Sequence, residues 1–197
     1  MVSDAPQSDA TEPDRLAELI RHAGSQRYPP VHAWTPEQCG EIDIRIARDG
    51  GWYYQGSPIA RRRMVRLFAS VLKREGDAYY LVTPVEKLKI AVDDAPYVAV
   101  ALERHGAGRD QTLAFRTQTD ELVIADAEHP IRVETDAGTG APSPYVHVRD
   151  GLEALIARPV YYELAEIALT STPAGDSPGV WSRGAFFALS EDGEAVS

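Results

Sequence analysis

Two stretches of this chain can be laid over each other without a gap, at an offset of 34 residues. The first runs from Leu81 to Ile90 and the second from Phe115 to Ile124. A threonine, an acidic residue, a leucine, an isoleucine and a following proline coincide. Because alternating strands resemble one another by chance at apolar positions, only the threonine, the acid and the proline favour a real repeat. We therefore expect a structural duplication in which both stretches form superposable strands or hairpins with the same buried positions, Leu88, Ile90, Leu122 and Ile124.

A shorter repeat is formed by Ile59-Ala60-Arg61 and Ile156-Ala157-Arg158, each at the start of or inside a predicted helix. The long and the short repeat occur in opposite order: strand follows helix in the first half, and helix follows strand in the second. This order favours two related halves packed face to face over a solenoid, which needs several short units in sequence.

The remaining pattern predicts many strands and few helices, without the regular alternation of a doubly wound sheet. The class is α+β with largely antiparallel sheets. One helix is expected to begin at Ser57-Pro58 and to end at Gly76. A second helical region is expected from Leu152 to Leu169, where Pro159 either kinks the helix or starts a new one. We expect a disordered tail over 1–13, an N-terminal half over 14–95, a C-terminal half over 96–190 and an acidic tail over 191–197.

The net charge of −10 disfavours a nonspecific binder of nucleic-acid polymers, which needs a basic surface. No apolar stretch is long enough to span a bilayer and the first residues lack the features of a signal peptide, so we expect a cytoplasmic protein with no membrane partner. Cys39 is the only cysteine, which excludes an intramolecular disulfide and predicts a structural thiol. The five histidines lack paired ligand spacing. We expect no cofactor and no metal, although a metal site assembled from distant residues stays open.

The sequence contains none of the glycine-loop, nucleophile-elbow or HExxH motifs that identify many enzymes. We therefore assign no catalytic residue, and any nucleotide site must be built from side chains. A small hydrolase or transferase with dispersed catalytic residues remains the main alternative to a binding protein.

Positive charge is concentrated in the first predicted helix, although the chain is acidic. Arg62 and Arg66 lie opposite its apolar stripe, whereas Arg61, repeated as Arg158, lies nearer to it. These residues form either a solvated helix face or an anion site, because a helix N-terminus offers free N–H groups beside arginine forks. The basic set of this helix is Arg61, Arg62, Arg63, Arg66, Lys73 and Arg74.

Two further sets leave a structural and a functional interpretation open. The segment Thr83 to Lys87 is either an ordinary turn or a loop that presents a hydroxyl, a carboxylate and an ammonium group to a ligand. In the second half, rings and guanidinium groups can stack a base and hold a phosphate, or the tyrosines can be core-edge residues. This second set consists of Tyr145, Arg149, Arg158, Tyr161 and Tyr162.

Several runs together resemble the bacterial domain-of-unknown-function family 1285. They are Trp52 to Arg61, Leu67-Phe68, Tyr80 to Lys87, Pro144 to Leu152 and Arg158 before Tyr161-Tyr162. The resemblance implies a duplicated core whose C-terminal half is similar to pleckstrin-homology-like domains. It also implies a site for a nucleotide-like ligand between the halves and a role in signal transduction. Pro159, directly after Arg158, departs from this pattern and tilts the helix that presents the arginine.

From these observations we expect a non-enzymatic ligand-binding or signalling module with a small anionic or nucleotide-like ligand. A domain that uses its basic helix to contact an acidic protein is a further alternative, and no protein partner is identified. The residues expected to contact the ligand are Arg61, Thr83, Glu86, Lys87, Tyr145, Arg149, Arg158 and Tyr162.

Overall fold

The computed structural model describes residues 11–22, 29–135, 138–171 and 178–189, and these residues divide into two compact units. Unit 1 comprises residues 1–45 and 52–91, and unit 2 comprises 46–51 and 92–197. The expected tails over 1–13 and 191–197 lie largely outside the described residues, although a helix already begins at Glu12.

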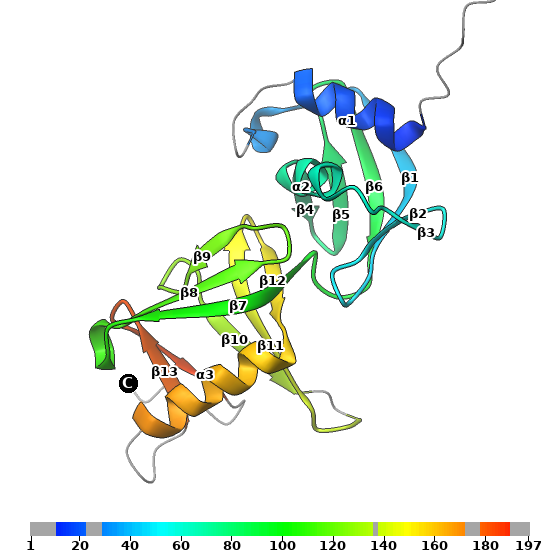
Figure 1. Cartoon of the computed structure of the whole chain (residues 1–197). Helices are drawn as coiled ribbons and strands as arrows, with labels where there is room; N and C mark the ends of the chain where they lie inside the picture. The colour runs from blue at the N-terminus through cyan, green and yellow to red at the C-terminus, as the bar shows by residue number, and fades with distance from the viewer. Residues whose placement is uncertain (1–10, 23–28, 136–137, 172–177, 190–197) are drawn as a thin grey trace, which may run out of the picture. The chain divides into compact units, whose positions relative to one another are not determined.

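Unit 1 is a six-stranded sheet accompanied by two helices (Figure 1). Helix α1 packs against helix α2, and fully buried Leu16 and Ile20 form part of the apolar face of α1. Ile42, Ile44 and Ile46 alternate with exposed residues along β1, as a half-buried strand requires. In chain order the elements are α1 (Glu12–His22), η1 (Val31–Ala33), β1 (Gln38–Ile46), β2 (Trp52–Tyr54), β3 (Ser57–Pro58), α2 (Arg62–Ser70), β4 (Leu72–Glu75), β5 (Ala78–Val82) and β6 (Glu86–Val92).

Unit 2 holds a second six-stranded sheet, with helix α3 along one face and a small hairpin (Figure 1). Strands β7 and β12 pair in parallel, whereas the other pairs with a known register in this sheet are antiparallel. The elements are β7 (Tyr97–His105), η2 (Gly108–Asp110), β8 (Thr112–Thr117), β9 (Leu122–Ile124), β10 (Ile131–Thr135), β11 (Pro142–Arg149), β12 (Leu152–Ile156), α3 (Arg158–Ser171), β13 (Gly179–Ser182) and β14 (Ala185–Ala188).

The two large sheets have the same strand order. The order is β3-β2-β1-β6-β5-β4 in unit 1 and β9-β8-β7-β12-β11-β10 in unit 2. In each sheet the first strand of the unit lies beside the sixth strand. The α+β class and the internal duplication are therefore confirmed, whereas the pleckstrin-homology-like character of the C-terminal half stays a prediction.

The expected register of the sequence repeat is wrong. Leu88 and Ile90 are buried, but Leu122 is 48% exposed and Ile124 is half-buried, while Val123 between them is buried. The cause is turn length. The Thr83 N–H donates to the carbonyl of Glu86 across a turn of four residues, whereas the Thr117 N–H donates to the carbonyl of Glu121 across a turn of five. A one-residue shift moves every later side chain of the strand to the other face of the sheet.

The first predicted helix is too long at both ends. Ser57-Pro58 forms the short strand β3, and α2 ends at Ser70, so that Lys73 and Arg74 lie on strand β4. Met64, Phe68, Val71 and Leu72 are nevertheless buried, and Arg62 and Arg66 are exposed, as expected. The sequence misleads here because the apolar residues of α2 and those of β4 follow each other at spacings that one longer helix also satisfies.

The second predicted helical region is a strand followed by a helix. Leu152 to Ile156 form β12, and α3 begins at Arg158 with Pro159 in its first turn. A proline is well suited to this position because the first N–H groups of a helix have no partner within it. Of the two alternatives for Pro159, the start of a new helix is therefore confirmed. None of the helices formed by the described residues is long and apolar enough to cross a membrane.

Candidate functional site

An arginine at the start of α2 in unit 1 binds the carboxylate of a residue on helix α1. Arg61 is the N-cap residue of α2, and its Nη2 lies 2.7 Å from Oδ1 of Asp14 in the first turn of α1. The hydroxyl of Thr11 donates to the other carboxylate oxygen of Asp14 at 2.6 Å. The Thr11 hydrogen bond, followed by Arg61, holds the pKa of Asp14 below its usual value. This corner of unit 1 thus binds and stabilises a negative charge.

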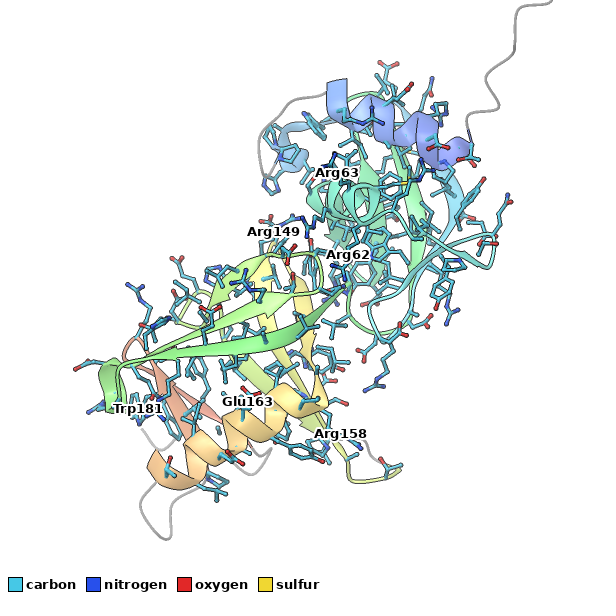
Figure 2. All side chains as sticks on the ribbon, in the orientation of Figure 1. Arg62, Arg63, Arg149, Arg158, Glu163 and Trp181 are labelled. Atoms are coloured by element: carbon cyan, nitrogen blue, oxygen red, sulfur yellow. The ribbon has the colours of Figure 1, made fainter. Side chains whose placement is uncertain are left out.

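Three further arginines follow on α2: Arg62, Arg63 and Arg66. All three are exposed, and with 3.6 residues per turn they span an arc of about 100° in which Arg66 lies between the other two. Figure 2 shows Arg62 and Arg63 on different sides of the helix start. The first turn contains no acidic residue, Arg61 makes no side-chain capping bond, and neither Arg62 nor Arg63 forms an ion pair with a described residue.

Thr83 and Glu86 are parts of a buried turn. The Thr83 hydroxyl accepts the N–H groups of Val85 at 3.3 Å and of Glu86 at 3.0 Å, and Thr83 has no exposed surface. The Glu86 carboxylate is also buried, and its Oε2 accepts a hydrogen bond from Nη2 of Arg15 on α1 at 3.2 Å. In this structure both side chains serve the turn and the attachment of α1.

Lys87 points into a small charged cluster on the neighbouring strands. Its ammonium group contacts Glu75, which also pairs with Lys73 at 3.0 Å, and lies 4.2 Å above the ring of Tyr80. The hydrogen bond to Glu75 raises the pKa of Lys87, and the hydrogen bonds from Lys87 and then Lys73 lower the pKa of Glu75. Lys87 is therefore a cation with its own carboxylate partner.

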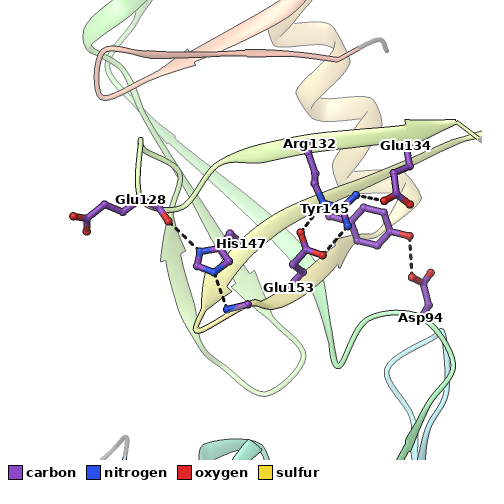
Figure 3. A network of polar contacts seen from close by, with 8 residues as sticks. Asp94, Glu128, Arg132, Glu134, Tyr145, His147 and Glu153 are labelled. Carbon is purple, nitrogen blue, oxygen red and sulfur yellow. Dashed lines mark hydrogen bonds and ion pairs between the residues drawn. The ribbon is translucent and has the colours of Figure 1, made fainter. Parts of the chain in front are cut away.

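Tyr145 belongs to a network in unit 2 that is drawn in Figure 3. Its hydroxyl donates to Oδ1 of Asp94 at 2.8 Å, and the guanidinium of Arg132 stacks 4.4 Å from its ring. Arg132 binds Glu153 through two hydrogen bonds of 2.6 Å and also contacts Glu134. Burial, followed by the hydrogen bond to Asp94, raises the pKa of Tyr145 to about 12. At neutral pH this phenol is a donor.

The other expected ligand residues of unit 2 lie in two separate places. Arg149, on β11, donates to the hydroxyl of Tyr97 at 2.9 Å. Arg158 and Tyr162 are exposed and stand one helical turn apart at the start of α3. Figure 2 shows Arg149 and Arg158 at opposite ends of unit 2, since β12 runs back between them. These residues do not form one cluster within the unit.

Within unit 1, helix α1 contacts two of the expected ligand residues. Asp14 pairs with Arg61, and its neighbour Arg15 pairs with Glu86. Sequence reasoning missed Asp14 and Arg15, and it also missed Asp94 and Arg132 beside Tyr145. Asp14, Arg15 and Asp94 lie far along the chain from their partners, so no motif spacing identifies them. Arg132 lies opposite Tyr145 on the neighbouring strand β10, a pairing that depends on the register of the two strands. The local signal was limited to acidic and basic residues in the first turn of an amphipathic helix.

Comparisons with known proteins give a consistent result. A family model for the N-terminal domain of the domain of unknown function DUF1285 matches residues 29–95, and a model for the C-terminal domain of DUF1285 matches residues 96–189. A DUF1285 family protein of known structure from Silicibacter pomeroyi DSS-3 is 52% identical, with a TM-score of 0.80, over 88% of this chain and 93% of that chain.

A second solved structure, a DUF1285 family protein from Shewanella baltica OS155, is 27% identical with a TM-score of 0.50, over 64% of this chain and 92% of that chain. A comparison with curated proteins gave no match. Both family models and both solved structures agree with the resemblance found in the sequence, and the chain belongs to the DUF1285 family.

Proposed function

We propose that this protein is a non-catalytic binding module for a small anionic ligand, of a phosphate-bearing and nucleotide-like kind, with a role in signalling. The main support for the proposal is the contact between Arg61 and Asp14. In it, Arg61 at the start of α2 already binds an anionic group, the Asp14 carboxylate, at 2.7 Å. A guanidinium that holds a carboxylate has the fork geometry that also suits a phosphate.

The charge distribution also favours an anion site at the start of α2. The chain has a net charge of −10, which repels anions at long range. At physiological ionic strength this repulsion is screened beyond roughly 8 Å, so that nearby groups dominate. Helix α2 carries three arginines and no acidic residue, and its N-terminal end adds the positive end of the helix dipole. The helix itself therefore presents only positive charge to a phosphate group at this end.

The proposal uses Arg61 and adds Arg62 and Arg63, which sequence reasoning had placed in the basic set but not among the ligand residues. Arg158 and Tyr162, exposed together on the first turn of α3, remain a separate prediction for unit 2. There a guanidinium and a ring one turn apart can hold a phosphate and cover a base.

Isothermal titration calorimetry with pyrophosphate, ATP and GTP, together with an assay for turnover, tests the proposal. The double variant Arg62→Ala/Arg63→Ala should weaken binding by about 10- to 100-fold, which corresponds to the roughly 1.5–3 kcal/mol of a hydrogen bond to a charged group. Arg104→Ala is the matched control, since Arg104 is an exposed arginine of β7 without an ion pair among the described residues. A parallel Arg158→Ala variant tests the α3 residues.

The outcomes separate the alternatives. Saturable binding without turnover that depends on Arg62 and Arg63 supports the proposal. Turnover of a nucleotide favours the hydrolase or transferase. Binding that requires an acidic macromolecule and disappears with salt favours the interaction domain. An unchanged affinity in the double variant contradicts the assignment of the site to α2.

A further inference from the structure

Asp14 occupies the position at Arg61 that an anionic ligand would take. Resting on the function proposed above, we propose that Asp14 is a built-in competitor for Arg61, so that the ligand enters by displacing the first turn of α1 from this arginine. The regulated element is thus the segment Thr11 to Asp14, and its displacement reports that the site is occupied.

The pair between Asp14 and Arg61 has the properties of an exchangeable contact. The two side chains keep 29% and 65% of their surface exposed, respectively. Exposed ion pairs are weak because water and salt screen them and because long side chains lose freedom when they are held together. A phosphate with two charges can therefore replace a single carboxylate at Arg61 without a large conformational barrier.

The rest of α1 is fixed, which confines the change to the first turn. Leu16, Ala17 and Ile20 are buried, and the neighbouring Arg15 is bound to Glu86. The second oxygen of Glu86, Oε1, is buried and makes no hydrogen bond with a described residue. Removal of Arg15 would leave this buried carboxylate without its positive partner, which is strongly unfavourable. Asp14 can move, but α1 stays docked.

The start of α3 provides an internal comparison. Arg158 follows the same Ile-Ala dipeptide as Arg61 and also begins a helix without an acidic first turn. Unlike Arg61, Arg158 forms no ion pair with any residue in the described part of the chain. The carboxylate at Arg61 is thus a particular feature of unit 1, supplied by a helix that lies before the residues matched by the N-terminal family model.

The test is a pyrophosphate titration of the full chain at constant ionic strength, with wild type, Asp14→Asn and the matched control Glu18→Gln. Glu18 is an exposed acid of the same helix, so both variants remove one negative charge from α1. If Asp14 occupies the site about 80–90% of the time, its removal should tighten binding by about 5- to 10-fold, because apparent affinity is reduced by the fraction of open sites. Glu18→Gln should change the affinity by less than about twofold.

A second variant keeps the net charge constant, so that a gain in affinity cannot come from the loss of one negative charge. Thr11→Val removes the hydroxyl that holds Asp14, and it should give a smaller gain in affinity, of about twofold to threefold. As an independent readout, saturating pyrophosphate should accelerate hydrogen exchange at the amide of Arg15 in the wild type, since this amide donates to the carbonyl of Thr11 at 3.0 Å.

The results distinguish failure of this inference from failure of the proposed function. Equal binding by wild type and Asp14→Asn overturns the competitor and leaves the anion site in place. Equal gains in Asp14→Asn and Glu18→Gln also overturn it, because net charge alone then explains the effect. Absence of binding in every variant removes the proposed function and this inference together. Binding by Asp14→Asn but not by wild type supports both.

Discussion

The two large sheets share one strand order, but they carry their helices in different places. Unit 1 has α2 between its third and fourth strands, whereas unit 2 has α3 after its sixth strand. The two Thr-containing turns also differ in position: the Thr83 turn joins the fifth and sixth strands of unit 1, and the Thr117 turn joins the second and third strands of unit 2. The duplication therefore lies in topology, and the local sequence echo connects two hairpins that are not equivalent.

Both hairpins nevertheless use the same turn chemistry. Thr83 and Thr117 each accept the backbone N–H of a buried glutamate, Glu86 or Glu121, at 3.0 Å. Beyond the turn, Leu81 pairs with Leu88 and Phe115 pairs with Val123. A threonine can thus recur at the start of both turns because its hydroxyl accepts a backbone N–H of a tight buried turn, even where the two turns do not occupy the same place in the duplication.

The largest difference between the two hairpins is expected for the matched pair Leu88→Ala and Leu122→Ala. An alignment of the sequence makes these leucines equivalent, but only Leu88 is buried. Leu88→Ala should lower the free energy of unfolding by about 2–5 kcal/mol. Leu122→Ala should lower it by less than about 1 kcal/mol. Urea denaturation measures both, and losses of similar size would show that the one-residue shift is wrong.

The shared turn chemistry predicts a similar loss in both hairpins when the hydroxyl is removed. Thr83→Val and Thr117→Val preserve the shape of the side chain but leave buried N–H groups without an acceptor, which should cost about 1–3 kcal/mol each. Thermal denaturation of the two variants, with Thr112→Val on the half-buried start of β8 as control, measures the effect. A neutral result at either threonine would mean that the two turns are not stabilised in the same way.

The smallest expected effect concerns the extra residue of the longer turn. Asp120 adopts a left-handed conformation with φ of 63°, whereas none of the residues Thr83–Glu86, all of which are described, has a positive φ. Asp120→Val should destabilise by about 1 kcal/mol because a branched side chain fits this conformation poorly. Val85→Asp, in the exposed part of the shorter turn, should change stability by less than about 0.5 kcal/mol. The reverse ranking in urea denaturation would contradict the assigned turn geometries.

Sequence reasoning found the class and the inward positions of α2 and β1, because these depend on local periodicity. It also predicted a duplication, but the repeat from which it did so joins two hairpins that are not equivalent, and the duplication is visible only in the strand order. Sequence reasoning failed where a boundary depends on tertiary context. Leu72 continues the apolar spacing of α2 but begins β4, and Leu152 to Ile156 are spaced as well for a helix as for the strand that pairs with β7. The residue that shifts the second hairpin, Asp120, is an ordinary turn residue in the sequence, and only the hydrogen-bond pattern reveals its effect.

For the site, the sequence identified residues by chemistry but not by their partners. Arg61 and the arginines after it could be found because charge concentrated on one short helix is visible in an acidic chain. Asp14 could not be found as the partner of Arg61, since nothing in the spacing of 47 residues brings them together. The same holds for Tyr145 and Asp94, whose contact depends on the packing of unit 2.

The parallel pair of β7 and β12 has a consequence for how unit 2 folds. Strands β7 to β9 and strands β10 to β12 can each form as a local meander, but Tyr97 must find Ala154 across the intervening chain. Loop closure of this length is entropically costly, and topologies rich in distant contacts fold slowly. We expect the two meanders to form first and the pairing of β7 with β12 to limit the folding rate. Substitutions at Ala99 or Ile156 should therefore slow refolding more than substitutions in the hairpin turns.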